Sequence, residues 1–173
     1  LVQVHQTKYL VEIGMSPAAA SFALGFVGLG GIVGQIGLGH LSDSIGREWA
    51  WTLAGLGYML CYALLLLLRA YPWPVLMYAM VASQGMLGYG LASVYGAIPA
   101  EIFHGRAYAS IFGSINMTAA LGAGAGPWVA GLSQDLLGSY TPAFWLALAV
   151  SALSILSIWM AAPRRGGLRR ARA

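Results

Sequence analysis

Five long stretches of this sequence contain no aspartate, glutamate, lysine, arginine or histidine, and they constrain the fold more than any other feature. They cover residues 18–38, 49–68, 75–98, 107–132 and 143–162. A helix rises about 1.5 Å per residue, so roughly 20 apolar residues cross the ~30 Å hydrocarbon core of a bilayer. An open strand would leave its backbone polar groups unpaired in lipid. The sequence therefore predicts an all-α membrane protein with five complete transmembrane helices.

The charged residues between these stretches predict an orientation. Charged side chains make up 8% of the 173 residues, against about 25% in a typical soluble domain. One side of the membrane would hold Arg47, Arg106 and a basic tail, 164–173, and the other side Lys8 and Arg69. Cytoplasmic loops carry the excess of basic residues. We therefore expect a multi-pass protein of a bacterial-type inner membrane with a cytoplasmic C-terminus. Nucleic-acid binding by the tail is the less favoured alternative, because a basic segment after a long apolar run is typical of a cytoplasmic flank.

The stretch GHLSDSIGRE, residues 39–48, gathers three charges and two glycines between the first two predicted spans. Gly46 permits a tight turn that a side chain would obstruct. Asp43 and Arg47 are four residues apart, so they could pair across one helical turn. The plain interpretation of this stretch is a well-formed turn at the membrane interface.

The same residues support a more specific interpretation. GHLSDSIGR, residues 39–47, resembles the G-x-L-x-D-x-x-G-R loop signature of the major facilitator superfamily, in which it joins the second and third helices of each six-helix half. Residues 102–106, 126–128 and 138–141 resemble the same half, and the last segment, with Phe144, is similar to monocarboxylate and oxalate-formate members. A second basic residue is common where this chain has Glu48.

The resemblance implies that residues 1–163 form the C-terminal half of such a transporter. The five complete spans would be its eighth to twelfth helices, and residues 1–14 the end of the seventh and a loop. The partner would be a missing N-terminal half, and the chain, which does not begin with methionine, looks like a piece of something longer. The resemblance also implies that the motif residues Gly39, Asp43, Gly46 and Arg47 act in gating, with Asp43 approaching a helix of the missing half.

Three uncharged polar residues within the predicted spans are candidates for binding a solute. Gln84 and Tyr95 share a helix face with Gly88 and Leu91 at 4-3-4 spacing, and Asn116 lies in the following span. Polar groups at that depth are costly and usually functional. The alternative is hydrogen bonding between helices, worth about 0.6 kcal/mol per bond on average. That alternative is favoured for Gln35, which lies late in the first span.

The remaining ionisable residues and the motifs of the sequence argue against an enzyme, a metal site and a cofactor site. His5, Lys8 and Glu12 lie at the end of the expected seventh helix, where they would either couple protons or act as surface charges. The other two histidines are scattered, so no metal site is expected. No nucleophile–base pair, nucleotide-binding loop or cofactor motif is present, so we expect no enzyme and no cofactor.

The resemblance to the major facilitator superfamily implies secondary active transport, and the similarity to monocarboxylate members implies an organic anion as the solute. A small solute, in particular a small organic anion, would bind between this half and the missing one, and the two halves would rock to give alternating access. Two other classes remain open at this stage. The chain could be a transport-incompetent structural or regulatory membrane protein, or it could form an oligomeric pore.

Overall fold

The computed structural model describes residues 2–103 and 105–161, and their regular secondary structure is entirely helical. The basic tail predicted at 164–173 lies outside the described residues. The elements are α1 (Val2–Glu12), α2 (Pro17–Ile45), α3 (Arg47–Ala70), α4 (Pro74–Ala82), a π-helical turn (Ser83–Leu87), a 3₁₀ turn (Gly88–Gly90), α5 (Leu91–Tyr95), α6 (Ala97–Ile102), α7 (Tyr108–Leu137) and α8 (Thr141–Ala161).

Four helical segments of the described chain are long and apolar enough to cross a membrane, which confirms the prediction of an all-α membrane protein. They are Pro17–Ile45, Arg47–Ala70, Pro74–Ile102 and Thr141–Ala161. The fifth predicted span, 107–132, coincides with α7, which has 30 residues but is rich in glycine, alanine and hydroxyl side chains. Its length suffices for crossing, and that it does cross stays a prediction.

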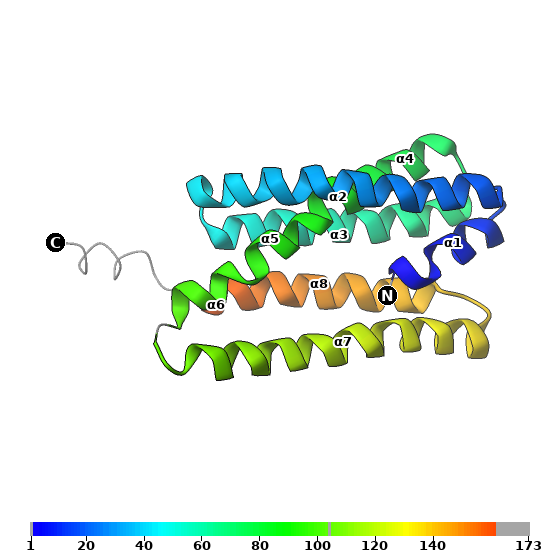
Figure 1. Ribbon diagram of the computed structural model, residues 1–173. Coiled ribbons are helices and arrows are strands. Elements are labelled where there is room, and N and C mark those ends of the chain that lie inside the picture. Colours follow the sequence, from blue (N-terminus) through cyan, green and yellow to red (C-terminus); the bar gives the residue numbers. More distant parts are fainter. Residues whose placement is uncertain (1, 104, 162–173) are drawn as a thin grey trace.

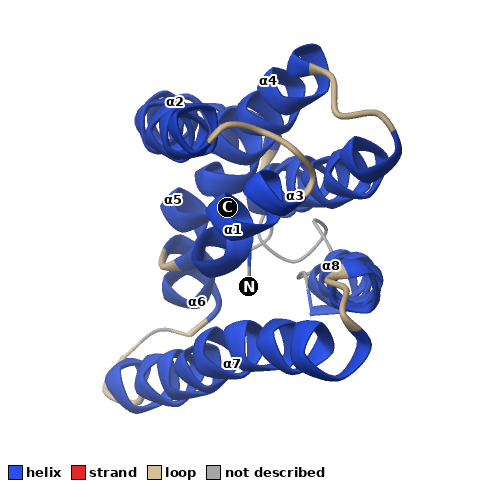
Figure 2. Cartoon of the chain, turned by 90° about the vertical axis from the view of Figure 1, so that its right-hand side faces the viewer, coloured by secondary structure: helices blue, strands red, loops and turns tan. Residues whose placement is uncertain are grey.

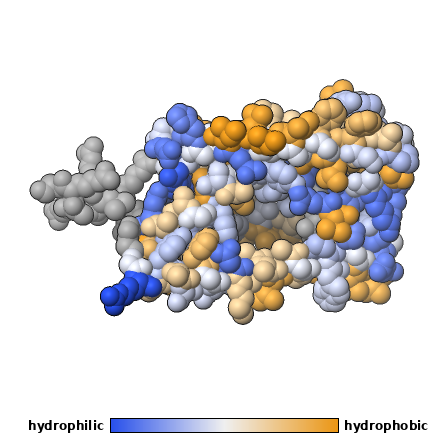
Figure 3. Space-filling model, in the orientation of Figure 1, coloured by the Kyte–Doolittle hydropathy of each residue, from blue (hydrophilic) through white to orange (hydrophobic). Residues whose placement is uncertain are grey.

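The helices form a bundle in which α7 stands apart (Figures 1 and 2). α2 and α3 lie side by side with α4 and the following turns packed against both, and α8 packs along α3. The α3–α8 contact includes a hydrogen bond from the Trp51 indole to Ser154, 3.1 Å, and an edge-to-face pair of Trp49 and Trp159. The exposed side of α2 is apolar and forms a band along the bundle in Figure 3, as expected of a surface that faces lipid.

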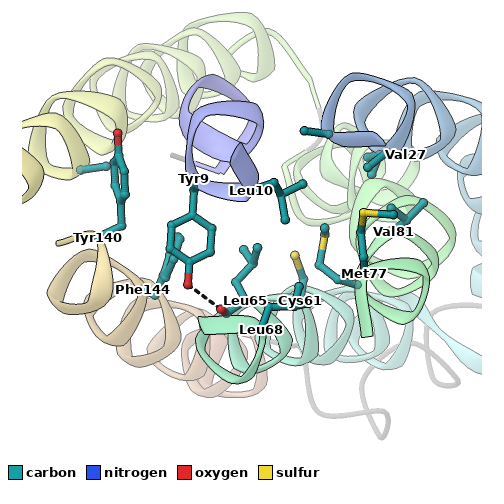
Figure 4. Packing of buried hydrophobic residues seen from close by; sticks show 14 of the residues in the cluster. Tyr9, Leu10, Val27, Cys61, Leu65, Leu68, Met77, Val81, Tyr140 and Phe144 are labelled. Atoms are coloured by element: carbon teal, nitrogen blue, oxygen red, sulfur yellow. Dashed lines mark hydrogen bonds between the residues drawn. The ribbon is translucent and has the colours of Figure 1, made fainter. Parts of the chain in front are cut away.

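The main hydrophobic core lies between α1, α2, α3, α4 and the start of α8 (Figure 4). Tyr9 of α1 is 3% exposed and donates a hydrogen bond from its hydroxyl to the Leu65 carbonyl at 2.7 Å. Its ring meets Phe144 edge-to-face, with centroids 5.0 Å apart. The short helix α1 is therefore tied to the bundle by aromatic packing and a buried hydrogen bond.

Glycines allow α2 and the third span to approach within backbone contact. A Cβ atom at Gly34 would lie 2.5 Å from the Met86 carbonyl oxygen, and one at Gly85 would lie 2.8 Å from the Val27 carbonyl oxygen. Both distances are shorter than side-chain carbons tolerate. Small residues at such crossings let membrane helices pack by van der Waals contact.

The motif stretch 39–48 is less of a loop than the sequence suggests. Helix α2 continues through it to Ile45, and α3 begins at Arg47, so Gly46 alone makes the turn. Gly46 has φ +100°, a conformation that L-residues with a side chain rarely adopt. The prediction of a glycine-dependent tight turn is confirmed, whereas the broader turn over the whole stretch is wrong.

The third predicted span, 75–98, is not one regular helix. It changes from α to π at Ser83, from π to 3₁₀ at Gly88, and back to α at Leu91. The 4-3-4 spacing from Gln84 to Tyr95 assumed a constant 3.6-residue turn, which residues 83–90 do not have, so the common face stays a prediction. π turns inside helices occur frequently at functional sites.

Candidate functional site

The irregular part of the third span borders a pocket of about 470 Å³. Helices α2 and α3 and the segment from the 3₁₀ turn through α5 form its walls. Its lining is Gln35, Tyr58, Tyr89, Leu91, Ala92 and Tyr95. Three phenols and one amide can donate and accept hydrogen bonds, and the lining carries no charged side chain. The pocket is therefore suited to a ligand with an apolar body and neutral hydrogen-bonding groups.

Glycines on the facing elements create the space that the tyrosine rings occupy. The Tyr58 ring lies against Gly88, where a Cβ atom would come within 3.0 Å of it, and the Tyr89 ring lies against Gly31 at still closer approach. Any larger residue at these glycines would displace a ring. The shape of the pocket thus depends on the same close helix crossings that hold the third span in the bundle.

Tyr95 is the predicted site residue that the structure places in the pocket. Its hydroxyl is buried and, within the described part of the chain, makes no hydrogen bond. Its ring faces Phe112 of α7, with centroids 6.2 Å apart. A buried hydroxyl without a partner is costly, so a ligand atom that pairs with it would gain a hydrogen bond.

The other two predicted residues lie elsewhere. Asn116 is exposed, and its amide donates to the Phe112 carbonyl of its own helix at 2.9 Å, so it lies one turn from the Tyr95 contact. Gln84 is 1% exposed, and its side-chain oxygen accepts a weak bond from the Cys61 thiol at 3.8 Å. Gln84 therefore contacts α3 from the π turn, and its buried side-chain nitrogen makes no hydrogen bond within the described part of the chain. The sequence favoured a packing role for Gln35, yet Gln35 lines the pocket. The sequence alone could not show this, since the rest of the lining comes from α3 and from the segment 89–95.

At the motif end of the bundle, where α2 meets α3, Arg47 joins two carboxylates. Its guanidinium lies 2.8 Å from Asp43, as the four-residue spacing predicts, although the pair spans the Gly46 turn rather than one helix. It lies 2.8 Å from Glu101 at the end of α6 and also donates to the Ser42 hydroxyl. Sequence reasoning missed Glu101. Two predicted spans, 49–68 and 75–98, separate Arg47 from Glu101, so both residues are expected on the same side of the membrane. That expectation could have identified Glu101 as a partner for Arg47.

At the opposite end, polar side chains connect α1, α3 and the α7–α8 junction. Arg69 donates to the Thr141 hydroxyl at 2.8 Å and to the Ser139 hydroxyl. Lys8 and Glu12 form an exposed pair at 3.8 Å, which is worth little in water. Glu12, Arg69 and Ser139 line a second pocket of about 260 Å³, together with Tyr9, Ile13, Gln134, Gly138 and Tyr140.

Comparisons with known proteins agree with this architecture. The sequence profile of the Major Facilitator Superfamily matches residues 6–172. Monocarboxylate transporter 13 of Bos taurus is 26% identical over 145 residues, which cover 83% of this chain and 34% of the relative. This chain thus spans about a third of the length of the relative. No solved structure matches the chain significantly. The family match over nearly the whole chain, together with the membrane-length helices, shows that this protein belongs to the major facilitator superfamily, a family of membrane transporters rather than enzymes.

Proposed function

We propose that this chain is the C-terminal half of a secondary active transporter that moves a small organic anion across a bacterial-type inner membrane. In this assignment α2, α3, the segment 74–102, α7 and α8 are the eighth to twelfth helices, and α1 is the end of the seventh. The N-terminal half, outside this chain, completes the solute pathway. Rocking of the two halves gives alternating access.

The observation that carries the proposal is the tyrosine-lined pocket beside the break in the third span. Secondary transporters bind their solutes near the bilayer midplane, typically where membrane helices are discontinuous. Residues 83–90 interrupt the span near its middle, and Tyr89 at that break contributes to the pocket. Irregular backbone at membrane depth is tolerated only where it is buried in protein or lines a cavity.

The proposed solute class rests on the named relative, whereas the pocket would bind the uncharged part of such a solute. The matched relative is a monocarboxylate transporter by name, and the pocket lining is uncharged. A carboxylate would therefore find its counter-charge in the missing half or at helix N-termini. The tyrosines and Gln35 would contact the rest of the solute, with Tyr95 and Asn116 at the edge that faces the missing half. Gln84 would act through packing.

The middle of α7 supplies the surface for that missing half. Its side chains from Ser114 to Ala125 are exposed apart from the half-buried Ile115, and a Cβ atom at Gly113, Gly122 or Gly124 would meet no other atom within 4 Å. A moderately polar helix with an open, glycine-rich face is suited to line a solute pathway against partner helices.

The motif residues Gly39, Asp43, Gly46 and Arg47 form the gate in this proposal, at the cytoplasmic end. Arg47 links the α2–α3 turn to the end of the third span through Glu101. A movement of that span against α2 would therefore stretch or break the ion pair. Because all three charged side chains are partly exposed, the network can exchange partners at modest cost.

Reconstitution tests this function. Proteoliposomes would contain either this chain alone or the longer protein that joins it to an N-terminal half, and uptake of radiolabelled pyruvate would be measured in both. We expect saturable uptake by the joined protein only. Gradient-independent conductance by the chain alone would overturn the proposal in favour of an oligomeric pore. Absence of uptake in both forms, for pyruvate and a panel of small anions, would overturn it in favour of a structural membrane protein.

A further inference from the structure

His5 occupies a site at which three elements converge. It lies on α1 and is partly buried between α7 and the α7–α8 junction. Its Nε2 atom is 3.0 Å from the Pro127 carbonyl oxygen of α7, and its Nδ1 atom is 3.3 Å from the Tyr140 hydroxyl. The His5 and Tyr140 rings are also in contact, with centroids 5.3 Å apart. Gly131, one turn beyond Pro127, leaves room for the imidazole.

These two contacts fix the tautomer of His5. The Pro127 carbonyl can only accept, so Nε2 carries a proton and donates it. In a neutral imidazole Nδ1 is then an acceptor, and the Tyr140 hydroxyl donates to it. Burial raises the pKa of Tyr140 above its ordinary value, which keeps the hydroxyl protonated and able to donate. Both ring nitrogens of neutral His5 are thus paired.

The hydrogen bonds of His5 belong to the attachment of α7 near its C-terminal end. Gln134 contacts Glu12 at 3.4 Å, and the Ser133 hydroxyl donates to the Ser139 carbonyl at 2.7 Å. The middle of α7 is exposed, as described above. A change at His5 therefore acts on the part of α7 that is held to α1 and the α7–α8 junction.

Four charged side chains act electrostatically on the phenols of Tyr140 and Tyr9, and Tyr140 is the direct partner of His5. Lys8 and Glu12 lie on α1, Arg69 on α3 and Asp135 on α7, which makes two positive and two negative side chains. The phenols of Tyr9 and Tyr140 are the other titratable groups at this site. A proton added to His5 would place a further positive charge beside Tyr140.

We propose that His5 is the proton-binding site of this transporter half, and that a proton bound at Nδ1 reverses the hydrogen bond that ties α1 to Tyr140 in the α7–α8 junction. The inference rests on the proposed transport function. The proton adds to the Nδ1 lone pair and gives an imidazolium, with no other bond made or broken. Nδ1 then becomes a donor, and Tyr140 must turn its hydroxyl proton away and accept instead. The Pro127 contact persists in both states, so the change is confined to the Tyr140 side.

His5→Gln is the sharpest variant because glutamine keeps the hydrogen-bonding capacity and removes the titration. Its amide nitrogen can donate to Pro127 and its oxygen can accept from Tyr140. In proteoliposomes of the full transporter, we expect this variant to retain exchange of radiolabelled pyruvate at equal concentrations and to lose accumulation driven by an inward proton gradient. His40→Gln, the same change at an exposed variable position of the motif, should leave accumulation intact. Gradient-driven accumulation by His5→Gln at the level of the unmodified protein would overturn the proposal.

Direct observation of the proton by NMR tests the proposal even if the His5→Gln variant fails to fold or to exchange solute. The chain has three histidines, so selective ¹⁵N-histidine labelling of the reconstituted protein gives a simple spectrum, and His40→Gln and a matching change at position 104 leave only the His5 signals. We expect the Nε2–H tautomer in the deprotonated ring and, on acidification, a doubly protonated ring with a changed Nδ1 signal. A ring that keeps one tautomer throughout would refute the inference. This readout needs no transport, so it separates failure of the proton site from failure of the proposed function.

Discussion

Gly34→Ala should destabilise the bundle although alanine is the better helix former. A Cβ atom at Gly34 would lie 2.5 Å from the Met86 carbonyl oxygen and 2.6 Å from the Gly85 carbonyl oxygen, whereas ordinary contact begins near 3.4 Å. Both obstacles are backbone atoms, so α2 and the π turn would have to separate by up to about 0.9 Å. Overpacking of a well-packed interior typically costs about 1–3 kcal/mol.

A matched control on the same helix removes the contribution of helix propensity. Gly37 is exposed, and a Cβ atom there would meet no other atom within 4 Å. Both substitutions gain roughly 0.5–1 kcal/mol from replacing glycine in a helix interior. The difference between the two variants therefore measures the steric term alone, and we expect Gly34→Ala to be less stable than Gly37→Ala by about 1–3 kcal/mol.

The assay is denaturant unfolding in mixed micelles, followed by tryptophan fluorescence from the six tryptophans of the chain. The midpoint for Gly37→Ala should equal or exceed that of the unmodified protein, and the midpoint for Gly34→Ala should lie below both. Coincident midpoints for the two variants would refute the close backbone crossing between α2 and the third span. The same result would remove the structural basis for the pocket beside that crossing.

Two further predictions concern the motif end and the pocket. Glu101→Gln removes the ion pair with Arg47 but, because the carboxylate is 57% exposed, should lower the free energy of unfolding by less than about 1 kcal/mol. The same variant should change the transport rate of the reconstituted protein, and a large stability loss with unchanged transport would contradict its place in the gate. Tyr95→Phe removes a buried hydroxyl that has no partner in the described chain, so the unfolding midpoint should stay the same or rise. Pyruvate affinity, from concentration-dependent uptake, should fall, and unchanged affinity would exclude this hydroxyl from the solute site.

Much of the fold follows from the order of residues along the chain. Hydropathy and length are local properties, so four membrane-length helices fall close to predicted stretches. The Gly46 turn and the Asp43–Arg47 pair were also predictable, because they depend on residues within a few positions of one another. Composition alone gives a weaker signal that α7 crosses the membrane, since its glycines and polar residues lower its hydropathy.

The candidate site was less predictable because it depends on contacts between distant residues. The π and 3₁₀ turns at residues 83–90 depart from a constant helical period, and Gln84 contacts Cys61 of α3 whereas Tyr95 lines the pocket. The role of Gln35 in the pocket and the contact of His5 with Pro127, 122 residues away, depend on how whole helices pack. Neither packing arrangement leaves a periodic signal in the sequence.

Cysteine labelling of intact cells that express the full transporter tests the central claim, that the membrane-length helices cross the bilayer with the Arg47 and Arg106 ends inside. The native thiol, Cys61, is buried and gives little background. Single variants Arg69→Cys and Arg106→Cys would be treated with a membrane-impermeant maleimide. We predict that position 69 reacts in intact cells and that position 106 reacts only after permeabilisation. Labelling of position 106 but not of position 69 in intact cells would contradict the account.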